Sequence, residues 1–209
     1  MNIEKLGWVA AAALAGGMVG MGFKAPGDKT GTVDIARVFK DSDLAKKQTD
    51  MLRAQVLARR SVMEFVSNNR NMKVDDANKL RDLMIKEQLT PAEKADVERI
   101  KQDAAAAEAK ARTLQTTDKP TAADLSQLDE FTKRKDASGQ LLDKWQKDFE
   151  AELRQKEDKA NEDTMLKVKE AINQVGHDQG YSIIFSQQIA PYCPNDITAD
   201  TAKKMNAGK

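Results

Sequence analysis

The side chains that usually carry enzyme chemistry are scarce in this sequence. It has one histidine, His177, and one cysteine, Cys193, in 209 residues. A catalytic triad needs a histidine held between two partners, and a structural zinc site needs four cysteine or histidine ligands. The sequence also lacks a glycine-rich phosphate-binding loop. It therefore predicts no catalytic residue, no metal site and no cofactor, and we expect a protein that is not an enzyme.

The distribution of charged residues indicates which partners the chain could bind. Basic side chains cluster at Arg59 and Arg60 and at residues 133–135. Such clusters can attract acidic headgroups, so contact with a membrane surface stays open, but solvated helix faces carry them routinely, and we favour that interpretation. Over the whole chain 34 Lys and Arg residues stand against 33 Asp and Glu residues. Because no basic field results, we expect no nucleic-acid partner.

The composition predicts long helices rather than one broad core. Aromatic residues make up 5% of the chain and charged residues 32%, and the mean hydropathy is −0.64. Long helices suit these values because each of their turns exposes most of its side chains to water.

The start of the chain carries an export signal. Residues 6–23 are uncharged and follow a short segment that contains Lys5. A helix of this length is ~27 Å long, slightly short of the ~30 Å hydrocarbon core of a bilayer. Its Ala and Gly residues make it only moderately hydrophobic. We therefore interpret residues 1–25 as a signal peptide, with an N-terminal anchor as the alternative.

Residues 180–198 depart from the charged helical pattern. Residues 181–186 are apolar and partly β-branched, which predicts a buried strand, and residues 195–198 offer caps for a last short helix. One strand needs a partner, and the other candidate strand in the sequence is residues 31–35. We therefore expect the two ends of the chain to meet.

Between these ends the pattern is helical. Thr90 with Pro91 and Glu93 is a strong helix-start signal, and Thr121 with Asp124 repeats it in a weaker form. Residues 68–71 predict a bend or an interruption. A reversal of the chain at 117–121 balances the arm lengths best. In the last helix, the polar stretches 132–140 and 154–164 are expected to be flexible.

Together these elements predict a mostly α, α+β fold. Its parts are a small β-rich domain formed by the two chain ends and a long antiparallel helical (coiled-coil) hairpin.

Five features of the chain occur in a characteristic order: residues 31–39, the charged hairpin, residues 168–175 and 180–185, and the segment Asn195 to Asp200 before a short helix. In these features the chain resembles the Skp (OmpH-like) family of periplasmic chaperones. The resemblance covers residues 31–205, and Asp196, Ile197 and Thr198 are its most specific part. The resemblance implies a periplasmic, ATP-independent holdase. Such a protein binds unfolded outer-membrane proteins in a cavity between helical arms and delivers them for insertion.

The resemblance also implies a homotrimer with a defined division of the chain. Residues 26–42 and 178–209 would form the association (trimerisation) domain, and residues 43–177 the helical-hairpin tentacle. Two features depart from the family pattern, since the arm is longer than expected and the net charge is close to neutral. Cys193 is expected to be a small buried residue of the association domain, with pairing between chains as the alternative. The expected core of that domain is Val33, Ile35, Ile183, Phe185, Tyr192 and Ile197.

The candidate client contacts are methionines, because methionine adapts to varied apolar shapes. They fall at helical spacing, so packing between helices is the alternative, which we favour for most of them. A different class of function also remains: a membrane-anchored coiled-coil structural or adaptor protein of the cell envelope, held in the inner membrane through residues 6–23. The candidate methionines are Met51, Met63, Met72 and Met84.

Overall fold

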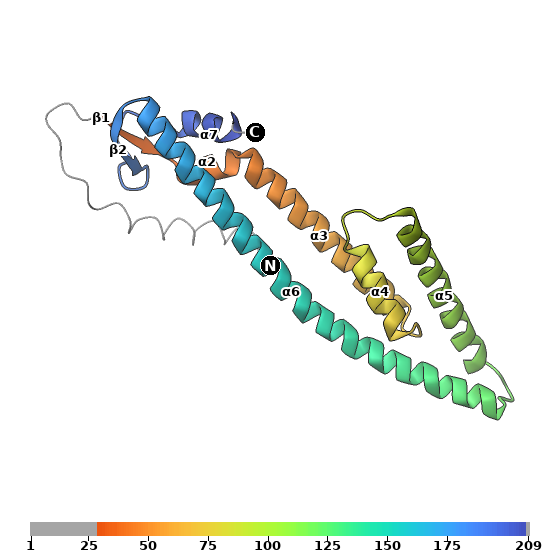
Figure 1. Ribbon diagram of the computed structural model, residues 1–209. Coiled ribbons are helices and arrows are strands. Elements are labelled where there is room, and N and C mark those ends of the chain that lie inside the picture. Colours follow the sequence, from red (N-terminus) through yellow and green to blue (C-terminus); the bar gives the residue numbers. More distant parts are fainter. Residues whose placement is uncertain (1–28, 208–209) are drawn as a thin grey trace. The chain divides into compact units, whose positions relative to one another are not determined.

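The structure is a computed structural model that describes residues 29–207. Its fold is mostly helical, with a two-stranded sheet built from the chain ends, as the sequence predicts (Figure 1). The expected signal peptide or anchor lies outside the described residues. The elements in chain order are β1 (Lys29–Val33), α2 (Ile35–Asp41), α3 (Asp43–Asn68), α4 (Val74–Met84), α5 (Pro91–Gln115), α6 (Ala122–Asp178), β2 (Tyr181–Ser186) and α7 (Thr198–Ala207).

The chain divides into two compact units, which we describe separately. The terminal unit comprises the described residues 29–50 and 157–207, and the middle unit comprises residues 51–156. The expected domain limits at 42/43 and 177/178 stay a prediction.

In the terminal unit, β1 and β2 pair in parallel, which confirms that the two chain ends meet. The first strand lies earlier than expected, at 29–33 instead of 31–35, because Asp34 starts a helix. Its side chain accepts a hydrogen bond from the backbone N–H of Arg37 at 3.0 Å and so caps α2. Ile35 is therefore the first residue of α2 and not the last of the strand.

Two glycines fit the end of α6 to the sheet. A Cβ atom on Gly176 would lie 2.7 Å from Cδ1 of Ile184, so a larger residue there would require the Ile184 side chain to move. Gly180 has φ +70°, a conformation that favours glycine after a helix, and its N–H donates to the carbonyl of His177 at 3.2 Å. The core beneath the sheet is Val33, Val38, Val168, Val175 and Ile197.

The middle unit holds four helical segments, from α3, α4, α5 and α6. After α3 the chain reverses at residues 69–73, and α4 runs back along the second half of α3 (Figure 1). The predicted interruption at 68–71 is therefore a complete reversal of the chain direction. Asn69 stabilises it, because its side-chain amide donates to the carbonyl of Phe65 at 2.8 Å and caps the end of α3. A further reversal at 85–90 leads into α5, and the expected one at 116–121 leads into α6.

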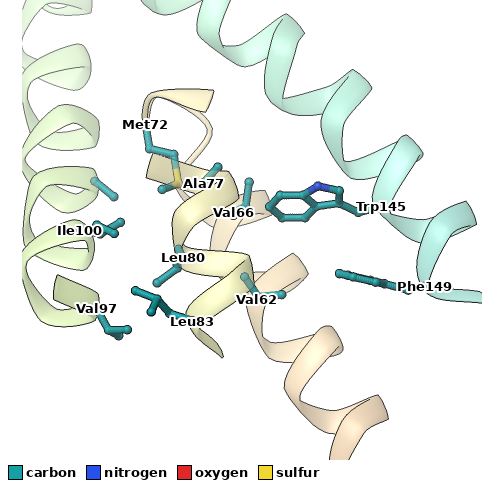
Figure 2. Packing of buried hydrophobic residues seen from close by; sticks show 11 residues of the cluster. Val62, Val66, Met72, Ala77, Leu80, Leu83, Val97, Ile100, Trp145 and Phe149 are labelled. Carbon is teal, nitrogen blue, oxygen red and sulfur yellow. The ribbon is translucent and has the colours of Figure 1, made fainter. Parts of the chain in front are cut away.

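These four segments share one apolar core (Figure 2). Trp145 and Phe149 project into it from α6, with their ring centroids 6.2 Å apart. The side chain of Leu80 on α4 is fully buried between the neighbouring helices. The buried members are Val62, Val66, Met72, Ala77, Leu80, Leu83, Val97, Ile100, Ala104, Trp145 and Phe149.

Both helix-start signals in the sequence are formed. At α5 the Glu93 N–H donates to Oγ1 of Thr90 at 3.2 Å, and the Thr90 N–H donates to the Glu93 carboxylate at 2.8 Å. Thr121 and Asp124 form the same reciprocal pair at 2.9 and 3.2 Å. The ammonium of Lys86 beside Glu93, followed by the hydrogen bonds from Thr90, lowers the pKa of Glu93 from 4.5 to about 2.

The last helix runs unbroken through both polar stretches that the sequence marks as flexible. In the first of them, residues 132–140, two side chains bind the turn at 69–73. Arg134 Nη1 donates to the carbonyl of Asn71 at 3.2 Å, and Ser138 Oγ donates to the carbonyl of Arg70 at 3.1 Å. This polar stretch is therefore a contact surface for the turn.

Lowering the pH should loosen the start of α5 over a defined range. Because folding lowers the pKa of Glu93, the carboxylate's contribution is complete above about pH 4.5 and is lost as the pH falls through about 2. An NMR titration of the Glu93 side-chain carboxyl carbon measures this directly. Lys86→Gln should move the midpoint toward 4.5. A wild-type midpoint near 4.5 would contradict the assignment.

Truncating the centre of the middle-unit core should be costly. Leu80→Ala leaves a cavity among α3, α4, α5 and α6, and we expect it to lower the free energy of unfolding by about 2–5 kcal/mol, as measured by urea denaturation. The matched control is Leu125→Ala on α6, because Leu125 is 54% exposed and its truncation should change stability by less than about 0.5 kcal/mol. Equal effects of the two variants would contradict this packing.

Candidate functional site

Among the described residues, the sheet of the terminal unit has no third strand on the outer side of β2. β1 is the central strand: β2 lies along one side, and on the other the N–H and carbonyl of Thr32 bond to Asn195 O and Ile197 N, both at 2.8 Å. Within residues 29–207 no strand lies beside the other edge of β2. An open strand edge is a template for pairing with another chain, and a sheet this small is marginal alone.

A shift in the strand register determines which side chains face away from the core. Lys29 pairs with Tyr181 but Thr30 pairs with Ile183, so the register shifts by one residue between these two pairs. After this irregularity Tyr181 and Ile184 face the core of the terminal unit, and both pack against it. Ile183 and Phe185 therefore lie on the opposite face. The side chain of Phe185 is 37% exposed.

Large apolar side chains are exposed at the end of β2 and in the segment that follows it. Phe185 is followed by Ile189, which is 62% exposed, and by Tyr192, which is 96% exposed. Single exposed apolar residues are common on protein surfaces, whereas several within one short segment indicate a surface that binds another protein. We call the outer edge of β2 together with the exposed side chains of Phe185, Ile189 and Tyr192 the candidate association surface.

The residues predicted to form the association-domain core fall into two groups. Val33 and Ile197 are buried, and Ile35 packs against them. Ile183 is half-buried, while Phe185 and Tyr192 are exposed in the single chain. Residues 29–207 of one chain leave these two aromatic side chains exposed, so their place in an association core stays a prediction.

The segment Asp196–Thr198 contributes to the core of the terminal unit and joins the start of α2 to the start of α7. Ile197 fills the core, 1% exposed. Thr198 Oγ1 accepts from the N–H of Asp34 at 2.8 Å and donates to the carboxylate of Asp196, which also accepts from the N–H of Thr198 at 2.8 Å. The hydroxyl of Thr198 thus joins the starts of α2 and α7.

A second connection was missed at the sequence level. Asn206 in α7 accepts from the N–H of Asp43 at 2.9 Å through its side-chain oxygen, and its amide donates to the carbonyl of Asp41 at 3.3 Å. It thereby bonds to the end of α2 and the start of α3. An asparagine near a chain terminus carries no sequence signal for a partner 163 residues away.

The remaining candidate residues occupy ordinary structural positions. His177 is exposed, and the half-buried thiol of Cys193 donates toward the carbonyl of Thr30 at 3.7 Å. Over the part of the chain that the structure describes, no His, Cys, Asp and Glu side chains gather into a group that could hold a metal ion. Across the same residues, no helix combines the length and the apolar character that crossing a membrane requires.

The four candidate methionines differ in exposure. Met72 is 3% exposed and belongs to the core of the middle unit, and Met63 and Met84 pack against that core. Met51 is 46% exposed. Contact of any of them with a client stays a prediction.

A buried arginine in the middle unit was also missed. Arg59 appeared at the sequence level as half of a basic cluster, but its side chain is only 5% exposed. Its Nη2 donates to Glu152 at 2.8 Å, and its guanidinium lies 5.3 Å from the ring centre of Phe149. The ammonium of Lys156, followed by Arg59, lowers the pKa of the Glu152 carboxyl below its ordinary value. A helical spacing that places Arg59 on the packed face is the only signal that sequence offered.

Comparison with known proteins gives one match. The family model described as "Outer membrane protein (OmpH-like)" matches residues 29–205. Searches of curated proteins and of solved structures find no match. The matched range contains both strands and the segment Asp196–Thr198, whose Thr198 the structure shows at the centre of the terminal unit's hydrogen bonds.

The two buried threonines of α7 provide a matched test of this hydrogen-bonded connection. Thr198→Val removes the acceptor of the Asp34 N–H, and we expect it to lower the free energy of unfolding by about 1–3 kcal/mol. Thr201→Val should be neutral or stabilising, because Thr201 Oγ1 is buried without a hydrogen-bond partner among the described residues. Thermal unfolding by circular dichroism and amide exchange of β1 measure both. Equal stability of the two variants would show that the Thr198 hydroxyl is dispensable.

Proposed function

The chain belongs to the OmpH-like outer membrane protein family, and from this membership we propose that it is an ATP-independent periplasmic holdase for unfolded outer-membrane proteins. The family is one of chaperone-type proteins that act on outer-membrane proteins. The holdase activity, the capture of clients between helical arms and their delivery to the membrane are the proposed steps for this chain.

The candidate association surface carries the proposal. Within residues 29–207 no strand lies on the outer side of β2, and Phe185, Ile189 and Tyr192 are exposed. Association into a homotrimer would cover these groups and would place three sets of helices around a common space. Burying apolar side chains of this size contributes about 1.5–3 kcal/mol each, which favours association.

The proposed mechanism is physical and breaks no covalent bond. An unfolded β-barrel protein exposes strand edges and apolar faces that aggregate. Enclosure by helical arms keeps such chains apart, and weak contacts through adaptable apolar side chains such as Met51 hold them. Release follows when the client folds into the membrane, because its apolar surface is then no longer available for binding.

Protection against aggregation tests this function. The mature protein, in stoichiometric excess, should keep a urea-diluted outer-membrane barrel protein soluble, as measured by light scattering, and should sediment as a trimer. Phe185→Ser combined with Tyr192→Ser should shift the protein toward monomers and reduce protection. Leu125→Ser is the control, because it changes an exposed apolar residue outside the terminal unit.

Two results would contradict the proposal. One is aggregation of the client at the same rate with and without the protein. The other is a wild-type monomer that protects fully, since the association surface would then have no part in holding clients. Retention of the protein in the inner-membrane fraction, without protection, would favour a structural or adaptor role.

A further inference from the structure

The middle unit contains an apolar face that its own helices cover. We call it the covered face: Val62 and Val66 of α3 with Trp145 and Phe149 of α6, none more than 7% exposed. We call residues 74–115, which comprise α4, the loop 85–90 and α5, the wing. Figure 2 shows Trp145 and Phe149 projecting from α6 toward α3 and the α4 helix of the wing.

One end of the wing is anchored by polar contacts. The N–H and the side-chain amide of Asn71, in the turn before α4, each donate to the carboxylate of Glu108 on α5 at 2.7 Å. Arg134 and Ser138 of α6 donate to carbonyls of the same turn at 3.2 and 3.1 Å. Near this end Ala111 and Leu114 of α5 also pack against Phe131 of α6. The turn at 69–73, α5 and α6 therefore meet at this anchored end.

The loop end of the wing is bonded chiefly to itself. Lys79 pairs with Asp96 at 2.7 Å, and Lys86 pairs with Glu93 at 2.6 Å, so both ion pairs join α4 to α5. Toward α6, Arg81 lies over the ring of Trp145 at 5.2 Å from its centre. A helix as short as α4, with 11 residues, has little stability without packing. Among the described residues, the loop end is therefore held on the covered face by apolar packing of Leu80 and Leu83 and by Arg81, without an ion pair or hydrogen bond to α6 like those at the anchored end.

The wing covers this face imperfectly. The indole N–H of Trp145 and the Nε–H of Arg59 are both buried and find no acceptor among residues 29–207. A buried donor without an acceptor is destabilising. A helix such as α4 uses its own carbonyls internally, whereas an extended polypeptide presents free carbonyl acceptors along its length. A strand of an outer-membrane barrel also alternates apolar and polar side chains.

We propose that the covered face is a client-binding surface and that the wing is its intramolecular competitor. This inference rests on the proposed holdase function. An extended segment of an unfolded barrel protein displaces the loop end of the wing and places its apolar side chains against Val62, Val66, Trp145 and Phe149. Its carbonyls accept hydrogen bonds from Trp145 Nε1 and Arg59 Nε. Segments with too little apolar surface leave the wing closed.

Tryptophan fluorescence reports this opening directly. Trp145 is the only tryptophan in residues 26–209, because the other one is Trp8. Acrylamide quenching of the mature protein should rise when a client binds. The probe is a urea-unfolded outer-membrane barrel protein whose tryptophans are replaced by phenylalanine, so that all emission comes from Trp145.

Loosening the loop end should strengthen client binding. Arg81→Ala removes the cation over Trp145 and should raise the open population about two- to fivefold. Since the closed form dominates, the apparent Kd for the client should fall by the same factor. The matched control is Arg112→Ala, an exposed arginine of α5 near the anchored end, which should change neither quenching nor affinity. Greater quenching without tighter binding would overturn the inference.

Locking the wing should have the opposite effect. In a Cys193→Ser background, Arg81→Cys and Asp148→Cys are joined by a bismaleimide, which ties α4 to α6 beside Trp145. The control is the same protein with both thiols capped by N-ethylmaleimide. The linked form should lose the client-induced rise in quenching and bind the client more weakly than the capped form.

The outcomes separate this inference from the holdase function. Equal protection by the linked and capped forms would overturn the inference and leave the holdase function standing. Failure of the wild-type protein to bind any client would overturn both. If the thiols do not link, the comparison of Arg81→Ala with Arg112→Ala decides the question alone.

Discussion

The parallel pairing of β1 with β2 is the constraint on which the rest of the chain depends. Parallel strands cannot be joined by a tight turn and need a long crossover, which here consists of every element from α2 to α6. Both ends of this crossover are therefore fixed sharply: Asp34 starts α2 directly after β1, and Gly180 ends α6 just before β2. The Thr198 hydroxyl bonds to Asp34, the residue that caps α2, and so joins the start of α2 to the start of α7. A chain this rich in charge builds its terminal unit on very few apolar residues.

That small core also explains why the terminal unit suits association. Its buried members are four valines and one isoleucine, too few to cover both faces and both edges of a sheet. β1 is protected on both sides, by β2 and by residues 195–197, so within the described residues the side of the sheet without a further strand is the outer side of β2. An open edge would be an aggregation hazard on a monomer, whereas in an oligomer it is a specific contact. In the proposed trimer, the same feature thus provides both assembly and protection from unwanted pairing.

The sequence predicts the elements of this fold better than their contacts. Thr90 and Thr121 mark helix starts correctly because a capping box is local, and the strand at 181–186 is visible because it interrupts a charged pattern. The reversal at 69–73 appears only as a poor helix segment, since apart from the local cap by Asn69 the bonds that stabilise it come from Glu108, Arg134 and Ser138 on other helices. The register shift in the sheet, the buried Arg59 and the bonds of Asn206 are likewise set by distant partners. Local signals therefore predict helix and strand ends, while the faces used for binding depend on tertiary packing.

The reversal at 69–73 matters most for function, because it places the wing on the covered face. Two continuous helices would leave Trp145 and Phe149 facing whatever lies between the arms. A permanently exposed face of this kind would bind apolar surfaces without discrimination, including those of other copies. A cover that satisfied every buried donor would in turn resist displacement. The wing is a cover between these extremes. The N–H groups of Trp145 and Arg59, which find no acceptor among residues 29–207, reduce the stability of the closed form, while apolar packing maintains it. A ligand shifts such an equilibrium only by its preference for the open form, and a chain rich in carbonyl acceptors and alternating apolar residues has that preference.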